Sequence, residues 1–403
     1  MSVLSGKKIL LGISGGIAAY KTATLVRLFI KAGAHVQVIM TPASKDFVTP
    51  LTLSTLSKNP VHSSFYNQDD ENEKWNNHVE LALWADLMVV APATANTLSK
   101  MTNGTCDNLL VAAYLSSKCP VYFAPAMDLD MYKHPSTIAN FASLTQFGNT
   151  IIPAESGELA SGLSGEGRMA EPENIVAFIE DDLNSKLPLK GKSILITAGP
   201  TYEAIDPVRF IGNHSSGKMG FDIASSAANL GAFVTLVTGP TSCKVFNPLI
   251  KVVNVVSAQE MYDACHEVYS TVDVAIAAAA VADYRPKNIA YQKIKKAADD
   301  FTIELEKTKD ILASFGEQKV HQFLIGFALE TENEIENAIL KIQKKNLDLI
   351  VLNSLQDQGA GFGKPTNKVT FIDQYLNVEP MELKSKEAVA DDILQKVKMH
   401  FLK

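Results

Sequence analysis

The sequence predicts an α/β protein with two Rossmann-like, doubly wound parallel-sheet domains. Apolar segments that read as fully buried strands alternate with helical segments along the whole chain. The strand, glycine turn and helix that open the chain are repeated about halfway along it. The length of 403 residues is also too great for one ordinary core, which favours two domains.

The first repeat opens with GKKILLGISGG, in which a buried apolar run ends in a glycine turn. A helical stretch follows, and its apolar residues fall on one side: Ala19, Leu25, Leu28 and Phe29. Gly33 ends that helix, and the run from His35 to Met40 reads as a second strand. This order of elements predicts a βαβ unit.

The second repeat begins with GKSILITAGP and continues through SSGKMGFDIASSAANL to Gly231 and a strand at residues 232–237. Its loop between strand and helix is longer, and this loop contains GNHSSGKM. Residues 85–94, 272–283 and 348–353 each place an apolar run after an acidic residue, which predicts further buried strands. Parallel sheets bind ligands at the carboxyl ends of their strands, so we expect the sites just after these runs.

The boundary between the domains is expected in LNSKLPLKGKS, where a polar helix end meets Pro188 and a new strand begins. The sequence therefore predicts a first domain of residues 1–188 and a second domain of residues 189–403.

The composition limits the classes of molecule that the protein is expected to bind. A net charge of −7 and a pI near 5.7 argue against nucleic acid, because phosphate backbones are bound by clustered Lys and Arg. The four cysteines lack C-x-x-C spacing, so neither a zinc site nor a disulfide framework is indicated, and a reducing cytoplasm fits. There is no signal-peptide pattern and no apolar run of the roughly 20 residues that a membrane span needs. Small molecules are the expected partners.

GNHSSGKM fits the G-x-x-x-x-G-K frame of a Walker phosphate loop, but Met219 stands where that loop needs Ser or Thr for magnesium. The preceding strand also ends too early, near Thr197. We therefore expect an anion-binding helix start formed by Ser215, Ser216 and Gly217, with a plain serine N-cap as the alternative.

The turn GISGG, which contains Gly12, Ser14, Gly15 and Gly16, allows the same two interpretations: an anion-binding helix start or a plain helix cap. It is not a G-x-G-x-x-G fingerprint, so a single phosphate is the simpler ligand.

Two further segments of the first domain contain polar residues that could take part in catalysis or binding. His78 follows Asn76 and Asn77 at a predicted helix start, and a helix N-terminus disfavours imidazolium, leaving a neutral ring able to accept a proton. A surface histidine is the alternative. Thr94, Asn96 and Ser99 follow a strand and suit a ring edge or a ribityl chain, although they read equally well as a polar helix cap.

Longer motifs carry a resemblance that covers nearly the whole chain. SGGIAAYK, NNHVELALWAD, PATANTLSKM with GTCDNLL, and APAMDLDMY are similar to the homo-oligomeric flavin-containing cysteine decarboxylases. GPTYEAIDPVRFIGNHSSGKMG, AAAVADYRP, KIKK, GFALETE and KIQKKNLDLIVLN resemble phosphopantothenate–cysteine ligase. In this order they resemble the bifunctional coenzyme A biosynthesis family of bacteria, which implies a flavodoxin-like flavin decarboxylase domain followed by a ligase domain.

The resemblance implies that the first domain binds FMN and decarboxylates 4′-phosphopantothenoylcysteine to 4′-phosphopantetheine. His78 matches the essential histidine, which handles the substrate proton, and Asp128 and Met131 lie in the substrate-binding motif. The implied FMN contacts are Gly12, Ser14, Gly15, Gly16, Ile17, Thr41, Thr94 and Asn96, with the flavin phosphate on the first-helix amides.

Two positions depart from the decarboxylase pattern. Asp128 replaces an Asn, and an ionised carboxylate would repel the substrate carboxylate unless it is protonated, turned away or paired. Ser161 replaces a cysteine whose thiol is expected to protonate the reduced intermediate, and a hydroxyl is a far weaker acid. Either Ser161 relays a proton from water or another group does. Ser161 lies in the segment GELASGLSGEG, whose four glycines suit either a lid or a plain surface loop.

For the second domain the resemblance implies ligation of cysteine to 4′-phosphopantothenate through an acyl-cytidylate made from CTP. Asn213 would hold the activated carbonyl and Lys293 would stabilise developing charge. Arg209, Ser215, Ser216 and Gly217 would bind the pantothenate phosphate. The implied nucleotide contacts are Ala277, Ala278, Ala279, Asp283, Lys293, Lys309, Asp310, Ile311, Leu312, Phe327, Lys341 and Lys345.

Lys309 departs from this pattern, because ligases often have Pro there, and a lysine-rich helix such as KIQKK is also typical of a solvated face. Magnesium is expected with the triphosphate, without identified ligands. The resemblance further implies a cytoplasmic homo-oligomer, a dodecamer built from flavin-domain trimers and ligase-domain dimers. A regulatory flavin-binding protein and an NAD(P)-dependent oxidoreductase are the alternatives, and the missing G-x-G-x-x-G disfavours the latter.

Overall fold

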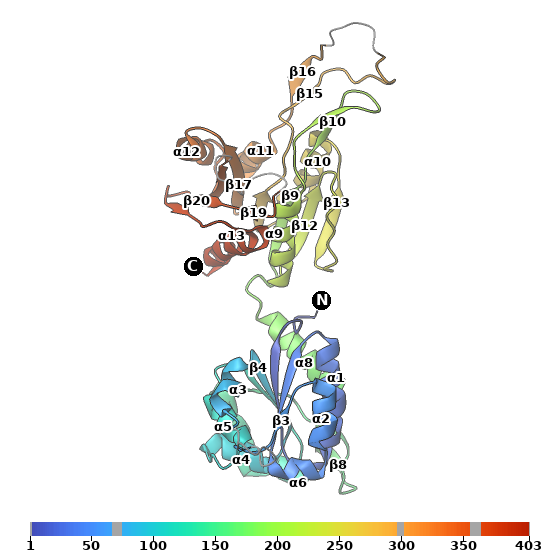
Figure 1. The fold of residues 1–403 in the computed structure, drawn as a ribbon, viewed down its shortest axis with the longest axis vertical. Helices are drawn as coiled ribbons and strands as arrows, with labels where there is room; N and C mark the ends of the chain where they lie inside the picture. Colours follow the sequence, from blue (N-terminus) through green and yellow to red (C-terminus); the bar gives the residue numbers. More distant parts are fainter. Residues whose placement is uncertain (1, 67–74, 296–301, 355–363, 403) are drawn as a thin grey trace. The chain divides into compact units, whose positions relative to one another are not determined.

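The computed structural model describes residues 2–66, 75–295, 302–354 and 364–402. The chain divides into two compact units, Met1–Ser185 and Lys186–Lys403, close to the boundary expected at residue 188 (Figure 1). Each unit has its own sheet and its own core. Within the described residues, no helix combines the length and the apolar character that a membrane crossing requires.

A single parallel sheet forms the centre of the first unit, with the strand order β3-β2-β1-β4-β5-β6. This is the order of a Rossmann sheet, and the chain reverses direction across the sheet between β1 and β4. The strands are β1 (Lys8–Ile13), β2 (His35–Met40), β3 (Val61–His62), β4 (Leu87–Ala93), β5 (Val121–Pro125) and β6 (Thr150–Ile151). The doubly wound parallel class predicted from the sequence is confirmed.

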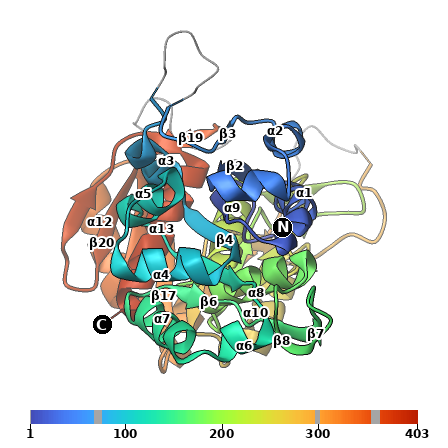
Figure 2. The same cartoon turned by 90° about the horizontal axis from the view of Figure 1, so that it is seen from below.

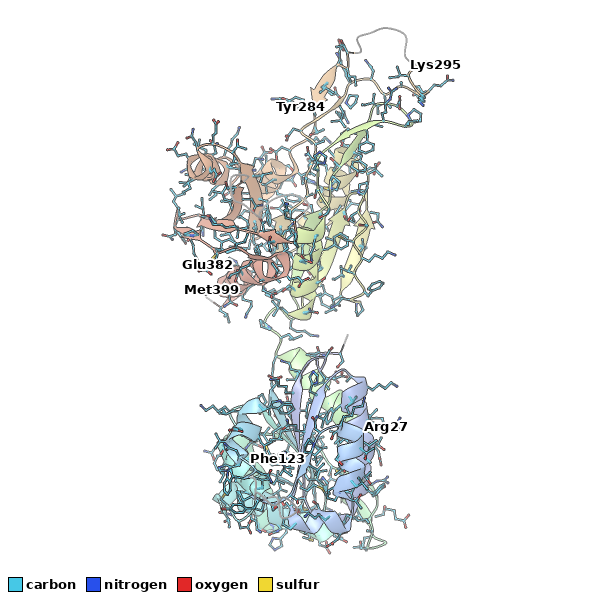
Figure 3. The ribbon with its side chains drawn as sticks, in the orientation of Figure 1. Arg27, Phe123, Tyr284, Lys295, Glu382 and Met399 are labelled. Atoms are coloured by element: carbon cyan, nitrogen blue, oxygen red, sulfur yellow. The ribbon has the colours of Figure 1, made fainter. Side chains whose placement is uncertain are left out.

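Helices cover both faces of this sheet (Figures 1 and 2). One face packs against α1 (Thr22–Lys31), α2 (Pro50–Ser57) and α8 (Pro172–Ser185). The other face packs against α3 (His78–Trp84), α4 (Ala95–Asn103), α5 (Leu109–Ser116) and α7 (Pro135–Gln146). Figure 3 shows Phe123 of β5 inside this unit and Arg27 of α1 at its surface, as the alternation of apolar and charged residues requires.

Short elements complete the first unit: the 3₁₀ helices η1 (Ile17–Lys21) and η2 (Pro42–Asp46), the helix α6 (Leu129–Lys133), and a hairpin of β7 (Glu155–Glu158) and β8 (Ser164–Arg168). The helix expected directly after GISGG therefore begins as one turn of 3₁₀ helix before α1. Packing explains the glycine at position 12, because a Cβ there would lie 2.4 Å from Cδ1 of Leu110 on α5.

The second unit contains a larger sheet with the order β13-β12-β9-β14-β17-β18-β20-β21. Its first six strands run parallel, and β20 and β21 are antiparallel additions at one edge. The strands are β9 (Ser193–Ala198), β12 (Phe233–Thr238), β13 (Ile250–Asn254), β14 (Val274–Ala277), β17 (Phe323–Glu330), β18 (Leu349–Ser354), β20 (Val369–Asp373) and β21 (Val378–Pro380).

Two helices, α9 (Lys218–Asn229) and α13 (Lys386–Phe401), cover one face of this sheet. The other face packs against α10 (Ala258–Tyr269), α11 (Ile311–Gln318) and α12 (Glu334–Lys344). Three two-stranded ladders lie outside the sheet: β10 (Tyr202–Ala204) with β11 (Phe210–Gly212), β15 (Tyr284–Pro286) with β16 (Leu305–Lys307), and β19 (Thr366–Asn367) with β22 (Lys384–Ser385). The long loop that precedes α9 is therefore partly a hairpin.

Candidate functional site

The first unit has a cavity of about 530 Å³ at the carboxyl ends of its strands, which we call the α4 cavity. Its walls come from the turn after β1, the start of η2, the first turn of α4 and the segment after β5. This position, where the strand order reverses, is where doubly wound sheets bind ligands.

Thr41 gives the α4 cavity an unsatisfied polar group. Its side chain is buried and its Oγ1 has no hydrogen-bond partner. An unpaired buried hydroxyl costs about 1–3 kcal/mol, so a ligand that bonds to it would be favoured. Thr94 caps α4 by accepting from the Thr97 N–H at 3.4 Å, and Asn96 follows in the cavity wall. These groups fit the polar edge and side chain of a flavin.

Ser14 has a structural role instead. Its hydroxyl donates to the Pro92 carbonyl at 2.6 Å and accepts from the Thr94 N–H at 3.1 Å, which ties the end of β1 to the end of β4. Gly15 contacts the same cavity and packs closely, because a Cβ there would lie 2.7 Å from the Cβ of Ala43.

A second cavity of about 520 Å³, the hairpin cavity, shares Ala126 and Met127 with the α4 cavity. Gly16 and Ile17 line the hairpin cavity, so the expected flavin contacts are divided between two adjoining spaces. Asp128 also lines it, while Met131 lines the α4 cavity.

The hairpin cavity contains a buried lysine that has an acidic partner. Lys21 is buried, donates to the Met169 carbonyl at 3.0 Å and forms a 2.9 Å ion pair with Glu171. The hydrogen bond from Lys21 lowers the pKa of Glu171. Asp128 accepts from the Leu129 N–H at 2.6 Å and so begins α6 as its N-cap.

Ser161 lies exposed at the tip of the β7–β8 hairpin, next to the Leu159 and Ala160 residues that line the hairpin cavity. The hairpin is fixed at its base, since Met127 donates its N–H to the Gly167 carbonyl at 3.0 Å. It also packs on α6, because a Cβ on Gly165 would lie 2.6 Å from Cδ1 of Leu129. The segment for which the sequence suited either a lid or a plain surface loop is thus a hairpin, and its residues 158–160 line the cavity.

His78 begins α3, and Asn77 caps the helix by accepting from the Val79 N–H at 3.0 Å. The ring packs edge-on to Phe65 at 6.1 Å and Trp75 at 6.4 Å, and its buried Nδ1 has no hydrogen-bond partner. His78 lines neither the α4 cavity nor the hairpin cavity of its own chain.

The second unit has a cavity of about 480 Å³ beside the start of α11, which we call the α11 cavity. Lys345 pairs with Asp310 at 2.6 Å, and Asp310 caps α11 by accepting from the Ala313 N–H at 2.9 Å. Burial disfavours ionisation of Asp310, but the hydrogen bonds from Lys345 and the Ala313 N–H, together with the charges of Lys345 and Lys341, outweigh burial and lower the pKa. The Lys309 amine lies 4.5 Å from the Tyr262 ring centroid.

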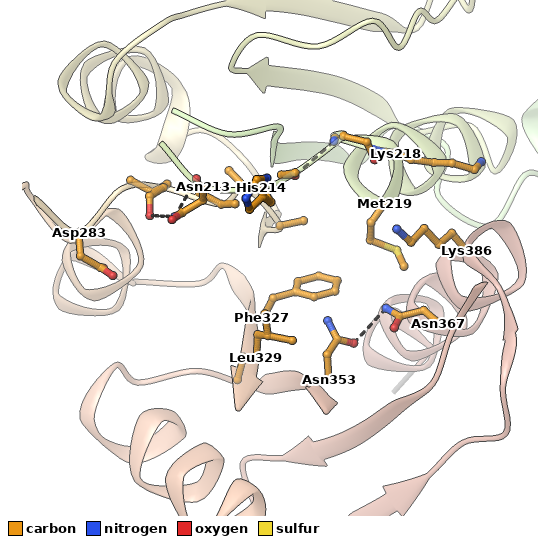
Figure 4. Close-up of a pocket in the computed structure, with 18 of the residues that line it drawn as sticks. Asn213, His214, Lys218, Met219, Asp283, Phe327, Leu329, Asn353, Asn367 and Lys386 are labelled. Carbon is orange, nitrogen blue, oxygen red and sulfur yellow. Dashed lines mark hydrogen bonds between the residues drawn. The ribbon is translucent and has the colours of Figure 1, made fainter. Parts of the chain in front are cut away.

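Lys341 lines both the α11 cavity and a second space of about 530 Å³, which we call the α9 cavity. Figure 4 shows residues that line the α9 cavity. The Lys341 amine donates to the Phe327 carbonyl at 2.9 Å, and burial followed by the nearby charge of Lys345 lowers its pKa. The two cavities share five wall residues: Ala279, Val281, Asp283, Phe327 and Lys341.

The start of α9 forms one wall of the α9 cavity. Its N-cap is Gly217 in the left-handed conformation with φ +78°, and no side chain caps the helix. The Ser215 and Ser216 hydroxyls accept the N–H groups of Gly217 at 3.3 Å and Lys218 at 3.4 Å. A plain serine N-cap is therefore not what the structure contains.

The Lys218 amine donates to both Asp222 carboxylate oxygens at 2.9 Å. It is therefore not available to bind phosphate as the lysine of a Walker loop does. Asn213 and Asp283 both line the α9 cavity (Figure 4), and the Asn213 Nδ2 donates to the Val281 carbonyl at 2.9 Å. Holding an activated carbonyl through Nδ2 would require this bond to open.

Family comparisons agree with both units. Residues 2–184 match the family described as Flavoprotein, and residues 189–401 match the DNA/pantothenate metabolism flavoprotein C-terminal domain. The coenzyme A biosynthesis bifunctional protein CoaBC of Bacillus subtilis (strain 168) is 43% identical over 397 residues, which cover 98% of this chain and 97% of that protein. The chain belongs to the family of coenzyme A biosynthesis bifunctional proteins.

Other relatives extend this picture. CoaBC of Vibrio vulnificus (strain YJ016) is 47% identical over 98% of both chains. A cysteine/cysteine sulfinic acid decarboxylase from an unknown prokaryotic organism is 52% identical over 355 residues, which cover 87% of this chain and 98% of that protein. The crystal structure of the C-terminal domain of CoaBC aligns with a TM-score of 0.46 at 45% identity, covering 54% of this chain and 98% of that chain.

Membership of this coenzyme A biosynthesis family confirms the resemblance stated from the sequence. The chain is a bifunctional enzyme with ligase and decarboxylase activities, and FMN and CTP are the cofactor and co-substrate of this family. A regulatory flavin-binding protein and an NAD(P)-dependent oxidoreductase are not favoured.

Most of the expected nucleotide contacts line one or both cavities of the second unit. Ala277, Lys309, Ile311, Leu312 and Phe327 line the α11 cavity, and Ala278 lines the α9 cavity.

Two expected residues lie outside both cavities of the second unit. Arg209 donates its Nε to Asp206 at 2.9 Å and its Nη2 to the Ile294 carbonyl at 2.9 Å. Lys293 precedes Ile294 in the same exposed segment.

Sequence reasoning also missed several residues of the α9 cavity, among them Asn353, Asn367 and Lys386. Asn353 ends the predicted strand at residues 348–353, so the rule that sites follow strand ends could have identified it. Asn367 and Lys386 come from β19 and the start of α13, and their positions depend on tertiary packing alone.

Proposed function

We propose that the second unit joins cysteine to 4′-phosphopantothenate with CTP, and that the first unit decarboxylates the resulting 4′-phosphopantothenoylcysteine to 4′-phosphopantetheine. One observation carries the ligase half most directly: Asp283, Phe327 and Lys341 line both cavities of the second unit. Two substrates held in adjoining cavities would meet at this shared wall, as a two-substrate condensation requires.

In the ligase unit, a carboxylate oxygen of 4′-phosphopantothenate attacks the α-phosphorus of CTP and pyrophosphate leaves. The cysteine amine then attacks the acyl carbon and CMP leaves. Lys341 is partly desolvated at the shared wall, and in its protonated form the amine would stabilise negative charge that develops there. Lys345, Lys309 and Asp283 contribute to nucleotide binding, and magnesium accompanies the triphosphate.

The α9 start is our candidate for the pantothenate phosphate, because Gly217 begins a long helix whose first N–H groups have no intrahelical partner. Asn213 supplies Oδ1 as an acceptor while Nδ2 bonds Val281, which suits a substrate N–H in the same cavity. Arg209 and Lys293 lie in two exposed segments that the Arg209–Ile294 hydrogen bond joins, and they contribute only if these segments approach the cavity when substrate is bound.

In the decarboxylase unit, Thr41, Thr94 and Asn96 would hold FMN from the α4 cavity, and Gly16 and Ile17 from the hairpin cavity. The bound flavin supplies reversible hydride transfer, which the protein orients. Asp128 bonds the Leu129 N–H, so one of its oxygens is turned to the backbone. Ser161 sits at the hairpin tip, where it can pass a proton between water and the cavity.

His78 handles the substrate proton in this proposal, although it lies outside the cavities of its own chain. We therefore favour a homo-oligomer in which a neighbouring copy completes the site, with trimers through the first unit, dimers through the second, and a dodecamer overall. Two exposed aromatic rings would suit such a contact: Trp75, which packs against the His78 ring, and Tyr66, which packs against Trp75. We also place the enzyme in the cytoplasm.

A second candidate for the first unit is decarboxylation of free cysteine or cysteine sulfinic acid. It is favoured by the 52% identical relative of that name and by Asp128 and Ser161, which depart from the pattern of phosphopantothenoylcysteine decarboxylases. A carboxylate at position 128 could bind the α-amino group of a free amino acid, which the pantothenoyl amide lacks.

Two measurements test the main proposal. FMN should be released in about one equivalent per chain when the purified protein is denatured. Pyrophosphate release should depend on both 4′-phosphopantothenate and CTP, and ATP should support less of it. A colourless protein would contradict the decarboxylase half, and nucleotide turnover without 4′-phosphopantothenate would contradict the ligase half.

A further inference from the structure

The α9 cavity contains a buried lysine that the ligase proposal does not use. Lys386 is the first residue of α13, and it is 6% exposed. It lines the cavity together with Met219 and Asn367, and Figure 4 shows its side chain reaching into the cavity towards Met219. A lysine is almost never buried to this extent unless its charge is paired.

No partner neutralises the Lys386 amine within the described part of the chain, where it has no ion pair and no side-chain hydrogen bond. The charge of Asp222 acts on the Lys386 amine, but Asp222 is held by two 2.9 Å bonds from Lys218. Burial lowers the pKa of Lys386, and the charge of Lys218 adds to this effect. Lys218 also pairs with Glu387 of the first turn of α13 at 3.3 Å, so these two carboxylates are occupied by Lys218 and the Lys386 amine is left without an ion pair of its own among the described residues.

Two helices add positive potential at this lysine. Lys386 occupies the first turn of α13, a helix of 16 residues, where the helix dipole disfavours a cation. The N-terminus of α9, which has 12 residues, opens on the same cavity at Gly217. A buried cation between two helix N-termini is unfavourable for the empty protein and favourable for a bound anion.

Neutral donors stand beside the lysine. Asn367 is 4% exposed and donates its Nδ2 to the Asn353 Oδ1 at 3.0 Å, which fixes both amides in the cavity wall. The Asn353 Nδ2 is left as a donor. A cation, amide donors and free helix N–H groups together are the usual recognition set for a phosphate group.

We propose that Lys386 binds a phosphate group of a ligase substrate at the end of the α9 cavity. This inference rests on the proposed function for the identity of the substrate but not for the chemistry of the group bound. The phosphate can come from the polyphosphate chain of CTP or from the phosphomonoester of 4′-phosphopantothenate, because both are anionic and both belong to the ligase reaction.

The test uses inorganic pyrophosphate as the probe, titrated into the full-length protein by calorimetry at low ionic strength. Lys386→Met keeps the length and apolar stem of the side chain and removes its charge. Lys398→Met is the matched control, because Lys398 lies on the same helix, bonds Gln395 and is outside the cavity. We expect Lys386→Met to weaken pyrophosphate binding at least about tenfold and the control to bind like wild type.

Competition then identifies the source. Displacement of pyrophosphate by CTP but not by 4′-phosphopantothenate assigns Lys386 to the nucleotide, and the reverse assigns it to the vitamin phosphate. Thermal unfolding of the ligand-free variant guards against misfolding: we expect its Tm to equal or exceed that of wild type, because an unpaired buried charge has been removed.

Equal pyrophosphate affinity in wild type and Lys386→Met would overturn the inference, as would wild-type protein that binds no pyrophosphate. Failure of the proposed function is a separate result: wild type would then bind the inorganic anion through Lys386 but form no 4′-phosphopantothenoylcysteine.

Discussion

Replacing Gly220 with alanine should impair the ligase unit while leaving the decarboxylase unit active. Gly220 lies in the first turn of α9, where the helix packs against the end of β9. A Cβ there would lie 2.5 Å from the Cβ of Ala198 and 3.1 Å from the Thr197 carbonyl oxygen. Neither contact can rotate away, because both are backbone or Cβ atoms.

The size of the effect follows from these distances. Carbon atoms in ordinary contact lie about 3.5–4.0 Å apart, so α9 must move outward by about 1 Å. Such overpacking costs about 1–3 kcal/mol, and alanine returns about 1 kcal/mol through its higher helix propensity. The free energy of unfolding should therefore fall by only about 0–2 kcal/mol. A misplacement of about 1 Å at the helix start that we propose binds the substrate phosphate should lower ligase kcat/KM about 100-fold.

Both activities can be measured on one sample, as pyrophosphate release and as carbon dioxide release from synthetic 4′-phosphopantothenoylcysteine. Asn229→Ala is the control, because it changes propensity at the exposed last residue of the same helix without a clash. Ligation by Gly220→Ala at the wild-type rate would refute the reasoning. Equal loss of both activities would point to general misfolding instead.

Three further changes have distinct outcomes. His78→Asn should abolish carbon dioxide release and spare ligation; loss of both would contradict the two-site account. Thr41→Val removes the unpaired hydroxyl of the α4 cavity, so FMN affinity, measured by fluorescence quenching, should fall about fivefold. Unchanged affinity would remove Thr41 from the flavin site. Arg209 holds the pKa of Asp206 well below its usual range, so the stability that this carboxylate contributes is present above an unfolded pKa of about 3.9. This stability is lost as the pH falls toward the pKa of Asp206 in the folded protein. Asp206→Asn should therefore make the free energy of urea unfolding less dependent on pH in the acid range. An unchanged pH dependence in that range would contradict a stabilising role for this ion pair.

The strands of both sheets could be predicted from the sequence because buried parallel strands are continuous apolar runs. The run at His35–Met40 coincides with β2, and the run predicted at residues 348–353 corresponds to β18. The antiparallel strands β20 and β21 were not predicted, because short edge strands have weak patterns and their pairing depends on distant partners.

The candidate sites could be predicted only in part. Motif residues such as Thr41, Asn213 and Lys341 do line cavities. Ser14 became a link between strands because hydrogen-bond partners across a sheet are not visible in the sequence. The burial of Lys386 could not be predicted either, since a lysine after Ser385 reads as an ordinary exposed first turn of a helix.

The central claim is that this chain builds 4′-phosphopantothenoylcysteine in one unit and decarboxylates it in the other. The most direct test supplies cysteine labelled with ¹³C in its carboxyl group and measures labelled carbon dioxide. We predict release only when 4′-phosphopantothenate, CTP and magnesium are all present. Labelled carbon dioxide from cysteine alone would contradict the claim and assign the first unit to the free amino acid.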